Sequence, residues 1–207
     1  LTRPVRLQKH GERLFAVTGT PTDSVMMALR EIMPDAPDLI LSGVNRGANL
    51  ADDITYSGTV SAAIEGALAG IRAIAFSQVY AREGMGDDVP FGAAREWGPK
   101  VLSRLIDAPM ADRTLINVNF PALPPEDVKG IRVVRQGFHD YSRGTIVEGR
   151  DPRGYRYFWF GLDQIEHTLD HGTDLEAIED GYVAVTPLQL DLTHYSTIGI
   201  LAERFGG

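Results

Sequence analysis

Short apolar runs alternate with runs of helical spacing between Leu14 and Phe120, and this alternation limits the possible folds more than any other feature. The apolar runs 14–17, 38–42, 73–77 and 115–120 have the length of strands, those over 38–42 and 73–77 are of the buried type, and a helix-like run follows each of the first three. Strands that alternate with helices predict βαβ units, which give a mostly parallel sheet with helices on both faces. The chain is therefore predicted to be an α/β protein.

Cap residues place the ends of several elements. Thr20 is the predicted N-cap of the first helix, with Pro21 as its first residue and Asp23 as the acid of its first turn. Asp23 is therefore interpreted as part of a helix cap rather than as a ligand. Much later in the chain, a short capped helix is expected over 173–179 and a strand over 182–186.

The C-terminal third differs in character because it contains an aromatic hairpin. Residues 145–148 and 155–160 are its predicted arms, and 151–154, with Pro second and Gly fourth, is a predicted type I turn. A two-stranded ribbon this apolar is not stable alone and is an aggregation risk when exposed. We therefore expect it to pack on another subunit. A last helix, capped by Thr193 or Ser196, is expected near the C-terminus.

Composition excludes several classes of protein. With 207 residues, of which 43% are hydrophobic, the chain is long enough for one domain with a sizeable core. Its net charge of −8 argues against binding to nucleic-acid polymers, which needs clustered Lys and Arg. No apolar run approaches the roughly 18 residues of a membrane span. The absence of cysteine excludes disulfides and thiolate metal sites, and it fits a cytoplasmic protein.

The stretch 42–63, SGVNRGANLADDITYSGTVSAA, is the main candidate for a functional site. It follows the strand 38–42 and leads into a predicted helix over 60–68, so it lies at the carboxyl edge of the sheet, where α/β proteins bind ligands. Its many short polar side chains are costly to bury without partners. Its glycines let the backbone approach a ligand, and free N–H groups at a helix start point at an anion. A phosphate group is the expected ligand.

Single residues of this stretch allow more than one interpretation. Asp52 and Asp53 could ligate a hard cation, but adjacent carboxylates on an extended segment point apart. We favour a structural role for Asp52 and leave Asp53 open. The triplet Ser57, Gly58 and Thr59 is the preferred phosphate cradle, and the alternative is a plain N-cap. The stretch lacks the Lys of a P-loop and the spacing of a dinucleotide fingerprint, which weakens a nicotinamide oxidoreductase as an alternative.

Six segments together form a specific pattern. They are GTPTD at 19–23, PDLILSGVNRGANL at 37–50, DDITYSGTVSAA at 52–63, INVNFP at 116–121, DPRG at 151–154 and GTDLEAIEDGYVAVTPLQLDLT at 172–193. With the aromatic hairpin arm, they resemble the SurE family (stationary-phase survival protein) over nearly the whole chain. The resemblance implies a Rossmann-like three-layer α/β/α core over 1–135. It also implies that 136–207 forms a hairpin arm, a return strand and a C-terminal helix used in oligomerisation.

The resemblance also implies an activity and a set of site residues. Members of the family are metal-dependent phosphatases that hydrolyse nucleoside 5′- and 3′-monophosphates and, in some members, short polyphosphate. By similarity, Asn45 is a metal ligand, and Asn49, Ser57, Gly58 and Thr59 lie at the substrate phosphate. One divalent cation per subunit is implied, Mg²⁺ or Mn²⁺. The implied partners are a nucleoside monophosphate and further copies of the chain, in a homodimer or homotetramer held by the C-terminal arm.

The chain departs from the family pattern at two places. It begins at Leu1 rather than Met, and the family's Asn-Asp-Asp-Gly motif, whose aspartates bind the metal and are central to catalysis, is not among its residues. The catalytic acids are therefore expected in a preceding segment; the alternative is an inactive nucleotide-binding or assembly protein. The second departure is Tyr195, beside His194, where many members have a histidine four residues after the Asp of the DLT motif.

Overall fold

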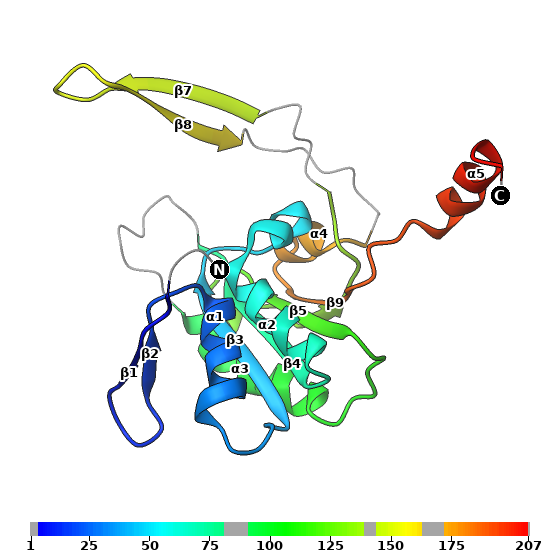
Figure 1. Ribbon diagram of the computed structural model, residues 1–207. Helices are drawn as coiled ribbons and strands as arrows, with labels where there is room; N and C mark the ends of the chain where they lie inside the picture. Colours follow the sequence, from blue (N-terminus) through cyan, green and yellow to red (C-terminus); the bar gives the residue numbers. More distant parts are fainter. Residues whose placement is uncertain (1–3, 81–90, 139–143, 163–171, 207) are drawn as a thin grey trace.

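The computed structural model describes residues 4–80, 91–138, 144–162 and 172–206, in which a central sheet lies between helices (Figure 1). In chain order, the elements are β1 (Leu7–Lys9), β2 (Phe15–Val17), α1 (Pro21–Met27), η1 (Ala28–Ile32), β3 (Leu39–Arg46), η2 (Ala51–Tyr56), α2 (Gly58–Leu68), β4 (Arg72–Gln78), α3 (Gly92–Leu105), β5 (Thr114–Phe120), η3 (Pro125–Asp127), β6 (Ile131–Val133), β7 (Gly144–Arg150), β8 (Arg156–Leu162), α4 (Asp174–Glu179), β9 (Val183–Gln189) and α5 (Tyr195–Arg204).

The central sheet has five strands in the order β3-β4-β5-β9-β6. β3, β4 and β5 run parallel to one another, β9 pairs antiparallel with β5, and β6 is parallel to β9. The predicted Rossmann-like α/β fold with a mostly parallel sheet is confirmed. Because β9 lies beyond residue 135, the sheet draws strands from both sides of the boundary expected between the core and the C-terminal region.

α2 and α3 cover opposite faces of the sheet, and the small and large residues that alternate along β4 face one helix each. On one face, small residues of α2 and β4 pack in a cluster that includes Val60, Ala63, Ala67, Ala73 and Ala75. On the other face, α3 packs on larger side chains in a cluster that includes Ile74, Phe76, Val101, Val118, Phe120 and Val183. The small residues let α2 lie very close to the sheet: a Cβ at Gly66 would lie 2.8 Å from Ile40 Cδ1.

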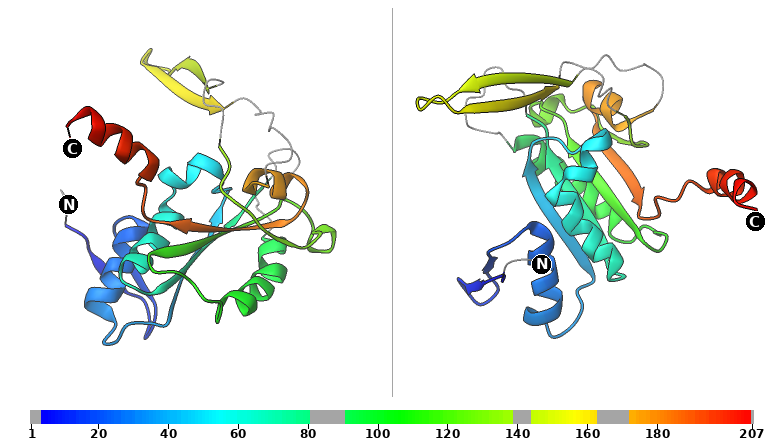
Figure 2. Two further views of the ribbon diagram at one scale, coloured as in Figure 1. Left: turned by 90° about the vertical axis from the view of Figure 1, so that its right-hand side faces the viewer. Right: turned by 45° about the horizontal axis from the view of Figure 1, so that its top comes forward.

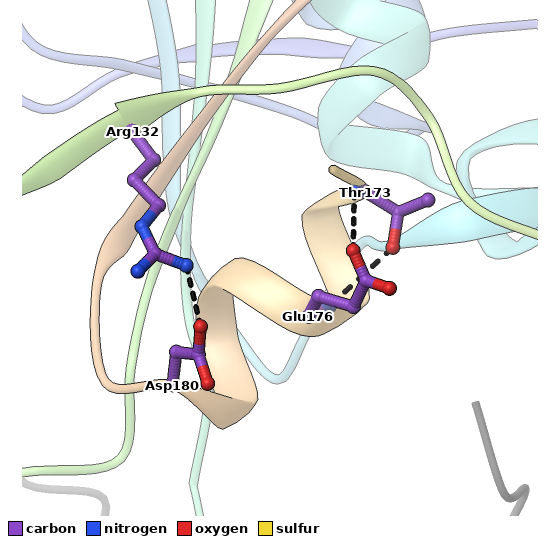
Figure 3. A network of polar contacts seen from close by, with 4 residues as sticks. All are labelled: Arg132, Thr173, Glu176 and Asp180. Carbon is purple, nitrogen blue, oxygen red and sulfur yellow. Dashed lines mark hydrogen bonds and ion pairs between the residues drawn. The ribbon is translucent and has the colours of Figure 1, made fainter. Parts of the chain in front are cut away.

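α4 is a short helix that is held at both ends (Figure 3). Thr173 N donates to Glu176 Oε2 at 3.0 Å, and Glu176 N donates to Thr173 Oγ1 at 3.4 Å, which completes a capping box. Asp180, after its last turn, pairs with Arg132 of β6, whose guanidinium lies 3.7 Å from the centroid of the Tyr182 ring. The predicted capped helix is therefore confirmed, and its position beside β6 and β9 is fixed.

The two ends of the chain differ from the sequence-based expectations. The strand predicted over 14–17 is present as Phe15–Val17, but it pairs antiparallel with Leu7–Lys9 in a separate hairpin and is not part of the central sheet. At the other end, the predicted caps of the last helix were wrong, because α5 begins at Tyr195 with His194 as its N-cap. Thr193 N donates instead to Asp191 Oδ1 at 2.9 Å, and the Tyr195 hydroxyl donates to the same carboxylate. Hydrogen bonding from the Thr193 side chain, from the Tyr195 hydroxyl and from Thr193 N lowers the pKa of Asp191 to about 2.

β7 and β8 form a two-stranded ribbon that stands off from the central sheet (Figure 1). Gly154 N donates to Asp151 O at 2.9 Å and closes the predicted turn at the tip. α5 also extends away from the body of the protein (Figure 2). Both elements expose large apolar side chains, including Ile146, Val147, Trp159, Ile198 and Phe205. None of the described helices, α5 included, is long and apolar enough to cross a membrane.

Candidate functional site

β3 reaches the candidate site through an irregularity in its pairing with β4. The register shifts between Ser42 and Asn45. Gly43, inside this shift, has a φ of +119°, and a Cβ there would lie only 2.3 Å from the backbone oxygen of Phe76. Only glycine allows this conformation and this close approach. The glycine of the SGVN motif therefore determines how the end of β3, and with it Asn45, meets the neighbouring strand.

Polar side chains form a row across the carboxyl ends of β3, β4 and β5. Asn45 lies opposite Ser77, and Ser77 lies opposite Asn119. Asn49 binds to this row: its backbone N donates to Asn119 Oδ1 at 2.9 Å, and its side-chain amide donates to Ser77 Oγ at 2.6 Å. Its backbone oxygen accepts from Asn117 Nδ2 at 2.8 Å and from Asn119 Nδ2 at 2.9 Å. Asn49 is only 6% exposed, so it anchors the loop to the sheet.

Asn45 is half-buried at the end of β3. Its Nδ2 donates to the backbone oxygen of Gly47 at 3.1 Å. This bond uses the amide nitrogen and orients the side chain, so that the carboxamide oxygen is the atom left for a ligand. An oxygen of this kind is a suitable donor to a hard cation.

Ser57 is the N-cap of α2. Its Oγ accepts from Val60 N at 3.1 Å, and its backbone oxygen accepts from Ser61 N at 2.9 Å. The N–H groups of Gly58 and Thr59 have no hydrogen-bond acceptor among the described residues. Two unpaired N–H groups and the positive end of the helix dipole attract an anion. The cap that the sequence analysis weighed as an alternative is therefore present, and it leaves the N–H groups of Gly58 and Thr59 available to an anion.

The start of α1 lies against the start of α2. A Cβ at Gly58 would lie 3.2 Å from Pro21 Cγ, which shows how closely the two ends pack. Asp23 N donates to Thr20 Oγ1 at 3.3 Å, and Thr20 N donates to Asp23 Oδ2 at 2.7 Å. The predicted cap is confirmed, and the hydrogen bonds from Thr20 lower the pKa of Asp23. The GTPTD segment thus packs against the start of α2, and its acid, Asp23, is engaged in the cap of α1.

Asp52 and Asp53 lie in η2, the 3₁₀ helix that connects Asn49 to Ser57, and both are half-buried. The extended segment assumed for this pair was wrong, because the backbone is helical here. Successive side chains of a 3₁₀ helix are about 120° apart, so the two carboxylates still diverge. The expectation that they do not share one cation keeps its physical basis.

The described residues do not form a complete metal site. Among them, no group of three or more His, Cys, Asp or Glu side chains is placed to hold a metal ion. Asn45 offers one oxygen, whereas a hard cation takes about six oxygen ligands, some of them water. A cation at this edge of the sheet would therefore need further ligands.

Comparison with known proteins decides the family. The family model described as survival protein SurE matches residues 1–143. The chain belongs to the SurE family. A SurE protein from Erythrobacter litoralis (strain HTCC2594), named 5′-nucleotidase SurE, is 67% identical over 206 residues, which cover 99% of this chain and 81% of the relative. The protein of the same name from Rhizorhabdus wittichii is 61% identical over 199 residues, with coverage of 96% and 78%.

A solved SurE structure agrees with the fold described above. The crystal structure of the SurE protein from Aquifex aeolicus superposes with a TM-score of 0.82 at 38% sequence identity, and the match covers 98% of this chain and 80% of that one. The resemblance inferred from the six sequence segments is therefore confirmed. The chain spans about four fifths of these SurE relatives, 81% and 78% of the two named above.

The structure also identifies residues that the sequence analysis missed. Asp174 and Gln136 both contact Ala51, the first residue of η2: Ala51 N donates to Asp174 Oδ2 at 2.9 Å, and Gln136 Nε2 donates to Ala51 O at 3.1 Å. In the SurE-like segment 172–193, Asp174 was treated only as part of a capped helix. The available signal was an acid directly after the N-cap Thr173, a position that does not by itself indicate a distant partner.

Proposed function

We propose that this chain is a 5′-nucleotidase, a phosphatase that hydrolyses the phosphomonoester of a nucleoside 5′-monophosphate. One observation carries the proposal: relatives named 5′-nucleotidase SurE are 67% and 61% identical to the chain over nearly its whole length. The site agrees with it, because a glycine-rich loop and a helix start lie at the sheet edge where phosphate groups bind. Nothing in the comparisons supports the alternative of an inactive nucleotide-binding or assembly protein.

The start of α2 is the proposed phosphate-binding part of the site. The N–H groups of Gly58 and Thr59 donate to the phosphoryl oxygens, on which negative charge develops during hydrolysis. Ser57 already caps Val60 N, so these donors are oriented before the substrate arrives, and such preorganised donors stabilise the transition state most. Asn49, buried against the sheet, holds the loop that precedes them. We include in the proposal that the same site hydrolyses nucleoside 3′-monophosphates and short polyphosphate.

A divalent cation and a cytoplasmic location complete the proposal. Asn45 Oδ1 would be one ligand of a Mg²⁺ or Mn²⁺ ion, and no group of three or more His, Cys, Asp or Glu side chains in the described part of the chain is placed to supply the others. A cation also offsets the repulsion between an anionic substrate and a chain of net charge −8. The absence of cysteine is consistent with a reducing compartment such as the cytoplasm.

A phosphate-release assay tests the function directly. The purified protein is incubated with 5′-AMP and 3′-AMP in the presence of Mn²⁺ or Mg²⁺, then with EDTA, and finally with an excess of the same cation. Turnover of 5′-AMP is expected with the cation, lost with EDTA and restored by the added cation. Absence of turnover on both nucleotides with either cation would contradict the proposal, and turnover that EDTA leaves unchanged would contradict the cation requirement.

We also propose that the chain forms a homodimer or homotetramer through the ribbon β7–β8 and α5. Val147 and Trp159 lie opposite each other in the ribbon, and they are 59% and 68% exposed. α5 adds Phe205, which is 87% exposed. Single exposed apolar residues are normal, but a paired row on a two-stranded ribbon indicates a surface that is covered in the assembled protein.

Sedimentation velocity tests this association. The protein is expected to sediment as a dimer or tetramer, and the double variant Val147→Ser, Trp159→Ser is expected to shift it towards the monomer, because the variant removes the apolar pair. Glu148→Gln is the matched control on the same ribbon. It breaks only an exposed ion pair with Arg156, which contributes roughly 1 kcal/mol or less. A wild-type protein that is monomeric at micromolar concentration would contradict the proposal.

A further inference from the structure

Asp174, the first residue of α4, is a fully buried carboxylate with 0% exposure. Its two oxygens accept three backbone hydrogen bonds: Oδ2 from Ala51 N at 2.9 Å, and Oδ1 from Gly137 N at 2.8 Å and from Leu175 N at 2.9 Å. An ionised carboxylate only accepts, so it matches a set of three donors. Burial raises the pKa of Asp174, and the N–H donors act against that shift.

The three donors come from three separate parts of the chain. Leu175 belongs to α4 itself, and Gly137 lies between β6 and the ribbon. Ala51 begins η2, the turn that leads to Ser57. One carboxylate therefore joins the loop of the candidate site to α4 and to the segment that precedes the ribbon.

Ala51 is the donor whose geometry most needs support. It has a φ of +49°, which is uncommon for a residue with a side chain, and its surface is 0% exposed. Asp174 accepts from its N–H, and Gln136 donates to its carbonyl oxygen at 3.1 Å. A backbone conformation of this kind persists only where the surroundings hold it. Here the surroundings include these two side chains and Leu175, which packs with Ala51 in one apolar cluster.

The loop of the candidate site thus has two successive anchors. Asn49 is bound to the ends of β4 and β5 through Ser77, Asn117 and Asn119. Ala51, which follows Asn49 by two residues, is bound to Asp174. From the second anchor, η2 runs directly to the N-cap of α2. A shift in the backbone of Ala51 would therefore move η2 and, with it, the peptide groups at the start of α2.

We propose that Asp174 is a positioning residue for phosphate binding and hydrolysis, acting through Ala51 on η2 and on the N–H groups of Gly58 and Thr59. The inference rests on the proposed function of the α2 start. It adds a residue that does not touch the substrate and that lies 123 positions from Ala51 in the sequence.

Asp174→Asn isolates the contact with Ala51. An asparagine oxygen can keep the two bonds that Oδ1 makes, with Gly137 and Leu175, whereas its NH₂ group cannot accept from Ala51 N. The reverse orientation would lose two bonds to keep one. The variant is thus expected to fold and to release η2. We expect kcat/KM for 5′-AMP to fall by about 10- to 100-fold, since misplacement by about 1 Å can reduce rates by 10²-fold.

Two further variants separate positioning from a merely structural role. Asp180→Asn makes the same chemical change at the other end of α4, where the partner is Arg132 and no described contact reaches the loop. It is expected to keep kcat/KM within about twofold of wild type, as surface substitutions usually do. Gln136→Ala releases the carbonyl of Ala51 and is expected to lower kcat/KM in the same direction as Asp174→Asn. It also carries the test if Asp174→Asn does not fold.

Binding of inorganic phosphate provides a measurement that is independent of turnover. The rise in Tm caused by phosphate is expected to be smaller in Asp174→Asn and in Gln136→Ala than in wild type or Asp180→Asn. A folded Asp174→Asn variant with a lower Tm, but with wild-type kcat/KM and a wild-type response to phosphate, would overturn the inference. If Asp174→Asn does not fold, a Gln136→Ala variant with wild-type kcat/KM and a wild-type response to phosphate would overturn the inference. A wild-type protein that binds phosphate but hydrolyses no nucleotide would contradict the proposed function, and the phosphate response of the variants would still decide the role of Asp174.

Discussion

Replacing Asn45 by alanine is expected to abolish most cation-supported turnover while leaving the protein folded. The side chain lies half-buried at the end of β3, and its described hydrogen bond is the one from Nδ2 to Gly47 O at 3.1 Å. Truncation therefore removes little packing, but it removes the oxygen proposed to bind the cation. Mutation of a residue that only supports a metal ligand typically lowers metal affinity or activity 10- to 100-fold. For the proposed ligand itself, a loss on the order of 100-fold in kcat/KM for 5′-AMP is therefore expected.

The matched variant Asn45→Asp distinguishes the ligand role from a role in the turn. Aspartate keeps an oxygen donor but cannot donate to Gly47 O, so it should retain more cation affinity than alanine while losing the same turn contact. Calorimetric titration with Mn²⁺ measures the affinity, and Tm measures the integrity of the fold. Equal turnover in wild type and Asn45→Ala would rule out the ligand role. Equal losses in both variants would assign the effect to the hydrogen bond with Gly47.

The parts of the structure that the sequence predicted depend on contacts between near neighbours. The cap of α1 joins Thr20 to Asp23, and the cap of α4 joins Thr173 to Glu176, three residues apart in each case. The strands before and after the candidate loop were predicted because buried parallel strands are continuously apolar. Local chemistry of this kind is visible in the order of residues alone. It was sufficient to place the loop at the carboxyl edge of an α/β sheet.

The parts that the sequence did not predict depend on distant partners. Asn49 binds Ser77 across 28 residues and Asn119 across 70, and Ala51 binds Asp174 across 123. No spacing rule connects such positions, because their contact follows from strand order rather than from periodicity. The helical turn at Asp52 and Asp53 was missed for the same reason. The conformation of Ala51, which starts it, is held by the distant residues Asp174 and Gln136.

The strongest structural constraint in the candidate site is predicted to be Gly43. In Gly43→Ala, the new Cβ would lie 2.3 Å from the backbone oxygen of Phe76, and the φ of +119° would be strained for any residue with a side chain. The two strands would have to separate where Asn45 pairs with Ser77. Strain and overpacking together should lower the free energy of unfolding by on the order of 4 kcal/mol. That is a large fraction of the stability of a typical domain, roughly 5–15 kcal/mol.

Gly70→Ala separates the strain at positive φ from the clash. Gly70 has a φ of +75°, but a Cβ there would meet no atom within 4 Å, so the variant carries only the backbone strain, about 1 kcal/mol. Urea unfolding of the two variants should therefore give a much larger loss for Gly43→Ala at an unchanged m-value. Similar losses would mean that β3 and β4 can separate at little cost. In that case the close approach at Gly43 would not hold Asn45 beside Ser77. The position of the Asn45 side chain would then have to depend on its hydrogen bond to Gly47.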